Sequence, residues 1–341
     1  MSTARPTTVY FELGPHDRFF RGLWESNLAR WVSLAPAEVR LVGSAGDAEF
    51  IVETSVPQNL NGGHVFRVSP NSRYARDPER TFAWDSQDLP TGRLPGLYCS
   101  LPRALHDPRR HRSFCYPYRY NPHLRAAAPG EADRHFGFTG TVTSPLRGRL
   151  FAVLGAESAA SRGLLRRTES IWGRMFTADD DSAKRRYCED LARCKFILCP
   201  RGNGVCSVRL FESLEAARVP VILSDRYVLP DGIDWSACAL RVPERDLGRL
   251  PALLAACEAG WPEMATRART VWEQNFSDNR RLARLAAELQ AIAAARREPE
   301  RRSGPRFWIR VLPPFAVAQL KRLHRNLPRP RRGAPPAPSS P

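Results

Sequence analysis

The chain has 341 residues, 43% of them hydrophobic and 8 of them Trp, which excludes an intrinsically disordered protein and favours two domains. No stretch of about 18 apolar residues is present, so no membrane-spanning helix is expected. The net charge of +17 is uneven, because residues 301–341 hold ten basic side chains and no acidic one, which leaves +7 for the first 300 residues. A mildly basic body suits an anionic small ligand, and we expect no nucleic-acid partner.

The first part of the chain alternates predicted strands with a predicted helix. A strand is expected at 7–14, a helix at 19–35, and short strands at 38–43 and 48–54. Strand, helix and strand in this order predict an α/β domain with a parallel sheet. Residues 70–130 are rich in Arg, Pro and Tyr and only weakly periodic, and such irregular segments inside a domain are often functional.

The same pattern starts again near residue 134. Residues 134–154 predict a short strand, a glycine turn and a helix opened by Ser144 and Pro145, and strands and helices then alternate up to residue 297. From residue 298 the chain is first charged and then rich in proline. The predicted fold is therefore α/β and GT-B-like. It has two Rossmann-like domains facing a cleft, at 1–135 and 136–297, followed by a basic, Pro-rich tail at 298–341.

Residues 196–225 place an apolar strand, the loop Pro-Arg-Gly-Asn-Gly, a helix and a second apolar strand in series. Gly202 and Gly204 nearly fit a nicotinamide dinucleotide fingerprint, with Asp225 about 20 residues further on as the ribose acid. The glycines are also compatible with a purely structural turn, in which Arg209 and Glu212 form a solvated pair. Both interpretations stay open at this point.

A third interpretation of the same stretch is a site for a nucleotide-sugar diphosphate. A helix that starts near Ser207 would point free backbone amides at an anion. Arg209 in the first turn and Arg201 in the loop would supply cations for phosphate oxygens. Glu212 lies on the same helix face, where its carboxylate can accept hydrogen bonds from ribose hydroxyls. The cations would also stabilise the negative charge that a departing diphosphate gains.

The motifs CPRGNG, SVRLFESLE, VPVILSD and VWEQNF follow one another between residues 190 and 290. Together they resemble the C-terminal half of the exostosin family of glycosyltransferases. The resemblance implies a GT-B architecture, inverting sugar transfer and no essential metal or other cofactor. It also implies a donor on the C-terminal domain and an acceptor on the N-terminal one. By motif match, Arg209 holds the diphosphate, Glu212 holds the donor ribose, and Arg147 adds a second cation.

Inverting transfer needs a general base that takes the proton of the acceptor hydroxyl. The loop FAWDSQDLP offers Asp85 and Asp88, of which we favour Asp88, and turn capping is the competing interpretation for both. His64 and His106 are further candidates. The Asp-x-Asp motif at 179–181 precedes a predicted helix, so we interpret it as helix capping and expect no metal site there.

The predicted function is a glycosyltransferase of hexosyltransferase type that moves a sugar from a nucleotide sugar to a glycan or lipid-linked glycan. The alternatives are an NAD(P)-dependent oxidoreductase and a catalytically inactive nucleotide-sugar-binding protein. The eight Cys never form Cys-x-x-Cys, and the first residues lack a signal-peptide core, so a cytoplasmic location is expected. Residues 307–327 mix apolar and basic side chains, which suits peripheral binding to an anionic membrane as well as a solvated tail.

Overall fold

The computed structural model describes most of the first 296 residues, all within the compact unit Met1–Arg302. The described ranges are 5–13, 18–34, 37–54, 73–90, 92, 94–117, 121–155, 162–168 and 181–296. His64, Asp179, Asp180 and the tail at 298–341 lie outside the described residues, so the predictions made for them stay predictions.

Six parallel strands of the described chain form the first sheet, in the order β2-β1-β3-β4-β5-β6. The strands are β1 (Thr7–Glu12), β2 (Val39–Leu41), β3 (Phe50–Thr54), β4 (Thr81–Asp85), β5 (Gly96–Tyr98) and β6 (His111–Ser113). Helix α1 (Arg18–Leu34) packs on this sheet through Trp24 and Trp31, whose rings lie 5.4 and 5.5 Å from that of Trp84 on β4. All three rings are fully buried, so the indole groups form the centre of this lobe's core.

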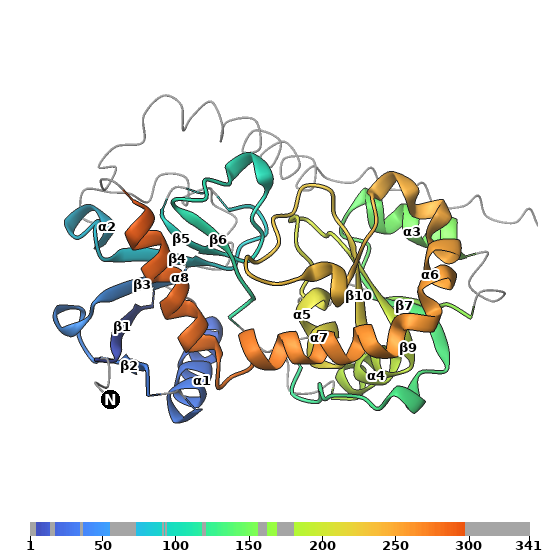
Figure 1. Cartoon of the computed structure of the whole chain (residues 1–341), viewed down its shortest axis with the longest axis horizontal. Helices are drawn as coiled ribbons and strands as arrows, with labels where there is room; N and C mark the ends of the chain where they lie inside the picture. The colour runs from blue at the N-terminus through green and yellow to red at the C-terminus, as the bar shows by residue number, and fades with distance from the viewer. Residues whose placement is uncertain are drawn as a thin grey trace, which may run out of the picture. The chain divides into compact units, whose positions relative to one another are not determined.

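Five parallel strands of the described chain form the second sheet, in the order β11-β10-β9-β7-β8. They are β7 (Arg134–Gly140), β8 (Leu164–Arg167), β9 (Cys194–Pro200), β10 (Val219–Leu223) and β11 (Leu240–Arg241). The accompanying helices are α3 (Pro145–Gly155), α4 (Asp181–Ala192), α5 (Arg209–Glu215), α6 (Leu250–Cys257) and α7 (Trp261–Asn275). One buried cluster packs α3 and α6 on the sheet, and another packs α5 and α7 on it, so both faces are covered (Figure 1). Coverage of both faces explains why β9 and β10 are almost continuously apolar.

Both sheets have the same strand order. In each lobe the second strand lies beside the first on one side, and the third strand starts a run on the other side. The order therefore reverses between β1 and β3 in the first sheet and between β7 and β9 in the second. Ligands of open parallel sheets bind at the carboxyl ends of the strands beside such a reversal. The α/β class and the two Rossmann-like lobes predicted from the sequence are confirmed.

Two features connect the lobes. Helix α8 (Arg281–Ala295) follows the helices of the second lobe but packs on β2, β5 and β6 of the first (Figure 1). The sequence analysis assigned residues 136–297 to the second domain, whereas this last helix covers the first sheet. In addition, Pro102 and Tyr227 form an antiparallel bridge, flanked by backbone hydrogen bonds of 2.9 and 3.0 Å.

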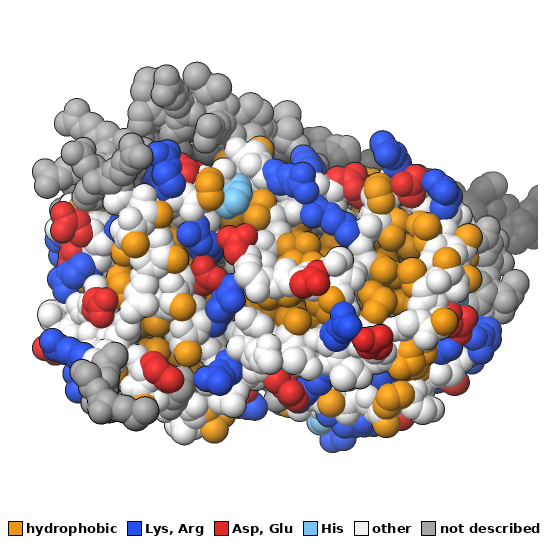
Figure 2. All heavy atoms as spheres, viewed as in Figure 1, with side chains coloured by type: hydrophobic (Ala, Val, Ile, Leu, Met, Phe, Trp, Pro, Cys, Tyr) orange, Lys and Arg blue, Asp and Glu red, His pale blue; other side chains and the backbone are white. Residues whose placement is uncertain are grey.

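The visible face of the molecule mixes acidic and basic side chains rather than separating them (Figure 2). This mixture fits a body whose net charge is modest compared with that of the tail. None of the helices in the described ranges combines the length and the apolar character needed to cross a bilayer.

Candidate functional site

The carboxyl ends of β7 and β9 are joined by Arg147, in the first turn of α3. Its guanidinium donates from Nη1 to the carbonyl oxygen of Thr141 (3.1 Å) and from Nη2 to that of Pro200 (3.2 Å). Only 7% of the residue is exposed. Arg147 therefore links the loops at the strand reversal of the second sheet.

Arg209, the first residue of α5, reaches the same edge. Its Nε and Nη2 both donate to the carbonyl oxygen of Thr139 on β7, at 3.1 and 2.6 Å. Its Cζ lies 4.8 Å from the ring centroid of Phe138 and 5.8 Å from that of Tyr187 on α4. Only 6% of Arg209 is exposed, so its side chain is buried at this edge rather than extended into solvent. Backbone and rings fix its position, and its remaining N–H groups stay available for a ligand.

Arg147 and Arg209 are like charges held close together. The pKa of Arg147 is lowered to about 9, first by burial and then by the positive charge of Arg209, while Asp88 acts in the opposite direction. In the part of the chain that the structure describes, both guanidinium groups bond to backbone carbonyls and neither forms an ion pair with a carboxylate. Buried charges normally have a partner, so this pair is suited to an anion that carries more than one negative charge.

Two glycines make room for these side chains. A Cβ atom on Gly140 would lie 2.3 Å from Nη2 of Arg209. A Cβ atom on Gly202 would lie 3.2 Å from Nη2 of Arg147 and equally far from Oγ1 of Thr143. Neither glycine has a positive φ angle, so the close approach of a side chain, rather than the backbone conformation, requires glycine at both positions.

Gly204 is required by a contact with the first lobe. A Cβ atom there would lie 2.5 Å from the carbonyl oxygen of Asp88 and 2.4 Å from Oγ of Ser100. Ser100 Oγ also accepts a hydrogen bond from the amide of Val205 (2.9 Å) and donates one to the carbonyl oxygen of Asp88 (3.1 Å). One hydroxyl therefore joins the loop that carries Asp88 to the loop that follows β9.

The two candidate bases have different surroundings. Asp88 is half-buried, and its negative charge acts on Arg147. Asp85, the last residue of β4, accepts a hydrogen bond from the amide of Gln87 (2.9 Å), which is the turn-capping contact considered from the sequence. The structure thus brings Asp88 within electrostatic reach of Arg147.

Glu212 lies one turn after Arg209 on α5 and is half-buried. Burial raises the pKa of its carboxyl group, whereas the charge of Arg209 and a hydrogen bond from Tyr187 lower it. The Tyr187 hydroxyl donates that bond to Oε2. Burial raises the pKa of Tyr187 well above its ordinary value, so the phenol keeps its proton. A guanidinium group and an oriented carboxylate therefore stand one helical turn apart.

Arg201 and Ser207 were also predicted to bind phosphate. Arg201 forms an ion pair with Glu244 (2.8 Å), so its charge is already neutralised. The Ser207 hydroxyl is buried and has no hydrogen-bond partner among the described residues. Helix α5 begins at Arg209, two residues after Ser207, and has only 7 residues. The arginine pair, rather than the end of this short helix, therefore provides the positive charge of the site.

Sequence analysis missed a group of carboxylates at the corresponding edge of the first sheet. Glu12 near the end of β1 is paired in register with Glu53 of β3, beside the strand reversal. Burial, followed by the charge of Glu12, raises the pKa of the Glu53 carboxyl. Arg73 forms an ion pair with Glu12 (2.6 Å). Each glutamate by itself fits an alternating strand, and only the pairing of β1 with β3 places them together.

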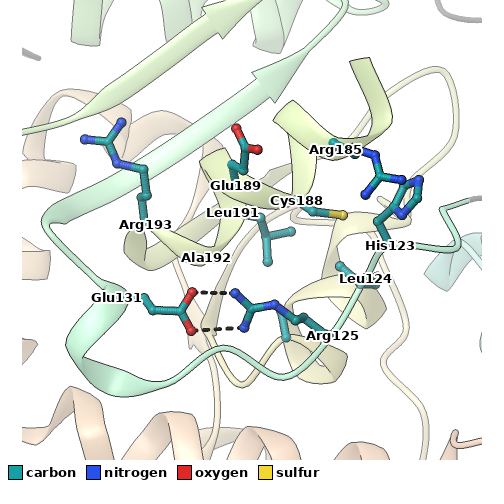
Figure 3. A pocket seen from close by; sticks show the side chains of 11 residues that line it. His123, Leu124, Arg125, Glu131, Arg185, Cys188, Glu189, Leu191, Ala192 and Arg193 are labelled. Atoms are coloured by element: carbon teal, nitrogen blue, oxygen red, sulfur yellow. Dashed lines mark hydrogen bonds and ion pairs between the residues drawn. The ribbon is translucent and has the colours of Figure 1, made fainter. Parts of the chain in front are cut away.

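Helix α4 and residues 123–131 line a pocket of about 500 Å³ (Figure 3). Its arginines are all paired with carboxylates: Arg125 with Glu131, Arg185 with Asp181, and Arg193 with Asp133. Exposed pairs of this kind leave little net charge for an anionic ligand. The pocket therefore differs from the site of Arg147 and Arg209, whose hydrogen-bond partners among the described residues are backbone carbonyls.

The acidic run at 179–181 is described only at Asp181, which begins α4. Its carboxylate pairs with His123 and with Arg185. Over the ranges that the structure describes, no cluster of three or more His, Cys, Asp or Glu side chains is arranged to hold a metal ion.

A comparison with known domains finds a match for the central part of the chain. Residues 110–257 match the model of the exostosin GT47 domain, a segment that runs from β6 to α6 and contains Arg147, Arg209 and Glu212. This part of the chain is thus similar to the catalytic domain model of exostosin glycosyltransferases.

Curated proteins match this chain over short segments. An Exostosin-1 homolog of Caenorhabditis elegans is 41% identical over 78 residues, which are 22% of this chain and 20% of that protein. Exostosin-1b of Danio rerio is 35% identical over 118 residues (33% and 16%). A probable glucuronosyltransferase of Oryza sativa subsp. japonica is 42% identical over 72 residues (20% and 17%). The chain thus spans at most about a fifth of the length of these relatives.

A solved structure of WaaG, a glycosyltransferase involved in lipopolysaccharide biosynthesis, aligns with 85% of this chain and 100% of that one. The sequence identity is 9% and the TM-score is 0.34, a likeness that supports no conclusion about the site.

Proposed function

We propose that this chain is an inverting glycosyltransferase of hexosyltransferase type. Its donor is a nucleoside diphosphate sugar, and its acceptor is a hydroxyl group of a glycan or lipid-linked glycan. The observation that carries the proposal is the pair of buried guanidinium groups, Arg147 and Arg209, at the strand reversal of the second sheet. A diphosphate matches two adjacent cations because each can donate charge-assisted hydrogen bonds to its oxygens.

The same cations assist the reaction as well as binding. The acceptor oxygen attacks the anomeric carbon while the bond from that carbon to the phosphate oxygen breaks. The electron pair of the broken bond leaves with the nucleoside diphosphate, which gains negative charge between Arg147 and Arg209. Glu212 accepts hydrogen bonds from the ribose of the same nucleotide. We propose no role for a metal ion or another cofactor.

The proton of the acceptor hydroxyl goes to a general base, for which we propose Asp88. Its loop is tied through Ser100 to the loop after β9, so acceptor activation and donor binding meet at one junction. Asp85 is the less suitable candidate, since its carboxylate caps a turn at Gln87. A cytoplasmic location and membrane binding through the tail stay predictions.

A dinucleotide site has less support. Gly202 and Gly204 follow β9, the third strand of its sheet, whereas the dinucleotide fingerprint follows the first strand. Gly204 packs on the backbone of Asp88. Asp225, the candidate ribose acid, accepts a hydrogen bond from the amide of Glu244 (3.1 Å). These contacts leave the glycines and the acid with structural roles.

The experiment is a screen of UDP-, GDP-, CDP- and ADP-linked sugars for hydrolysis and for transfer to glycan acceptors. With the sugar that is turned over, we expect Arg147→Gln and Arg209→Gln each to lower kcat/KM by about 10²- to 10³-fold. Arg125→Gln is the matched control, because that exposed arginine is already paired with Glu131, and it should change kcat/KM by less than about threefold.

Two results would contradict the proposal. Tight binding of a nucleotide sugar without turnover would favour the inactive binding protein, and equal losses in all three arginine variants would remove the special role of the buried pair.

A further inference from the structure

Helix α4 supports the candidate site with two side chains three positions apart. Tyr187 donates a hydrogen bond to Oε2 of Glu212, and its ring lies 5.8 Å from Cζ of Arg209. Asp190 accepts a hydrogen bond from Oγ1 of Thr139 (2.8 Å). The carbonyl oxygen of the same Thr139 accepts the hydrogen bonds of Arg209. Side chains on one face of α4 therefore contact Glu212 directly and Arg209 through its ring contact and through Thr139.

We propose that Tyr187 is a positioning residue that orients the Glu212 carboxylate toward the ribose of the donor. In this role it sets the preference for ribonucleotides over 2′-deoxyribonucleotides. The proposal rests on the proposed function, because it assigns Glu212 to the ribose. Tyr187 itself need not contact the nucleotide.

The geometry of the carboxylate carries this inference. Among the described residues, Tyr187 bonds to Oε2 and none bonds to Oε1, so Oε1 and the second lone pair of Oε2 can accept from the two hydroxyls of a ribose. A glutamate at the surface of a helix can rotate, whereas one that accepts a hydrogen bond from a half-buried tyrosine keeps a single orientation. A fixed acceptor rejects a ligand that lacks one hydroxyl, because the carboxylate is then left incompletely bonded.

The electrostatics around Glu212 provide a second readout. The titratable groups that act on it are Arg209 on its own helix, Tyr187 on α4 and Cys199 on β9. Burial raises the pKa of the Cys199 thiol to about 12, so this neighbour stays neutral. Removing the Tyr187 hydroxyl should raise the pKa of Glu212 further, because that hydrogen bond lowers it. Since the ribose hydroxyls need the charged form, nucleotide affinity should then be lost at a higher pH as the solution is acidified.

The test uses the full chain and calorimetric titration with UDP, GDP, CDP and ADP and with their 2′-deoxy forms. For the nucleotide that binds most tightly, we expect Tyr187→Phe to reduce the ribo-to-deoxy affinity ratio by about 3- to 10-fold. In a plot of nucleotide affinity against pH, the acidic limb, where affinity falls on acidification, should move to higher pH in this variant. Tyr98→Phe is the matched control, since Tyr98 is a buried tyrosine of the first lobe whose hydroxyl donates to the carbonyl oxygen of Leu94 (2.5 Å). It should change neither quantity.

The outcomes separate the two proposals. If the unmodified chain binds none of these nucleotides, the proposed function fails and this inference fails with it. If it binds them and Glu212→Gln lowers the ratio, but Tyr187→Phe keeps the wild-type ratio and acidic limb, only the positioning role is wrong. Should Tyr187→Phe not fold, Tyr187→Met takes its place, because it also removes the hydroxyl while an adaptable apolar side chain fills the site. An unchanged ratio and acidic limb in that variant would equally overturn the proposal.

Discussion

The first sheet carries carboxylates at its strand reversal, whereas the second carries guanidinium groups at the corresponding place. Glu12 and Glu53 occupy neighbouring positions on β1 and β3, and burial raises the pKa of Glu53. Arg147 on α3 and Arg209 on α5 reach the carboxyl edge of β7 and β9, and burial lowers the pKa of Arg147 to about 9. Two lobes of similar topology thus place side chains of opposite charge at their strand reversals, where Glu12 is paired with Arg73 and the two arginines have backbone carbonyl partners.

This difference shows how one topology serves two chemical tasks. The strand order fixes where a ligand is held, and the side chains at the reversal decide which ligand is held. Cations suit a diphosphate that gains negative charge, whereas carboxylates suit hydrogen bonds from the hydroxyl groups of an acceptor, whose reacting proton we assign to Asp88 on the same lobe. The two tasks of a sugar transfer can therefore be divided between the lobes, with the Ser100 contact between them.

The largest expected effect concerns the base. Asp88→Asn should lower kcat by about 10²- to 10⁴-fold, because no group then accepts the proton of the attacking hydroxyl. Glu53→Gln should change kcat by less than about threefold, although Glu53 is the carboxyl with the raised pKa at the reversal of the first sheet. Measuring kcat separately from KM is essential, since the charge of Asp88 also acts on Arg147.

The reverse pattern, a large loss in Glu53→Gln and a small one in Asp88→Asn, would transfer the base from the loop after β4 to the end of β3. In that case the reacting carboxylate of the first lobe and the cations of the second would both lie at the strand reversals of their sheets.

A smaller effect is expected from Gly140→Ala. The added Cβ would lie 2.3 Å from Nη2 of Arg209, and the end of that flexible side chain is the part that can move. We expect a loss of about 10-fold or more in donor affinity and a lower free energy of unfolding, because a displaced guanidinium group meets neither the phosphate nor the carbonyl oxygen of Thr139. Gly155→Ala is the control, since no atom lies within 4 Å of a Cβ at that position. Unchanged donor affinity in Gly140→Ala would mean that the position of Arg209 is unimportant.

The smallest expected effect tests the contact between the loops. Ser100→Ala leaves the buried amide of Val205 without the partner that it has at 2.9 Å. An unpaired buried amide costs about 1–3 kcal/mol, so the free energy of unfolding measured in urea should fall by this amount. Ser33→Ala removes an exposed hydroxyl on α1 and should change it by less than about 0.5 kcal/mol. Equal free energies of unfolding of the two variants would mean that Ser100 does not stabilise the contact between the Asp88 loop and the loop after β9.

The sequence predicts those parts of the site that depend on spacing along one element. Arg209 and Glu212 are three residues apart on a helix, and Ser144 with Pro145 opens the helix that carries Arg147, so local rules place these side chains. The long apolar runs of β9 and β10 likewise predict buried parallel strands.

The rest depends on contacts between distant segments. Ser100 meets Val205 across more than one hundred residues, and Glu12 meets Glu53 only through the pairing of β1 with β3. Tyr187 lies in a helix whose sequence does not reveal that its hydroxyl meets Glu212. Arg201 was assigned to phosphate because the sequence could not show its ion pair with Glu244. No local periodicity contains this information.

The most direct measurement is a crystal structure of the chain with a bound nucleoside diphosphate from the screen. The account predicts that the two phosphates lie between the guanidinium groups of Arg147 and Arg209, with the ribose hydroxyls on the carboxylate of Glu212. A nucleotide seated in the pocket beside Arg125 and Arg193, or at the carboxylates of the first sheet, would contradict it.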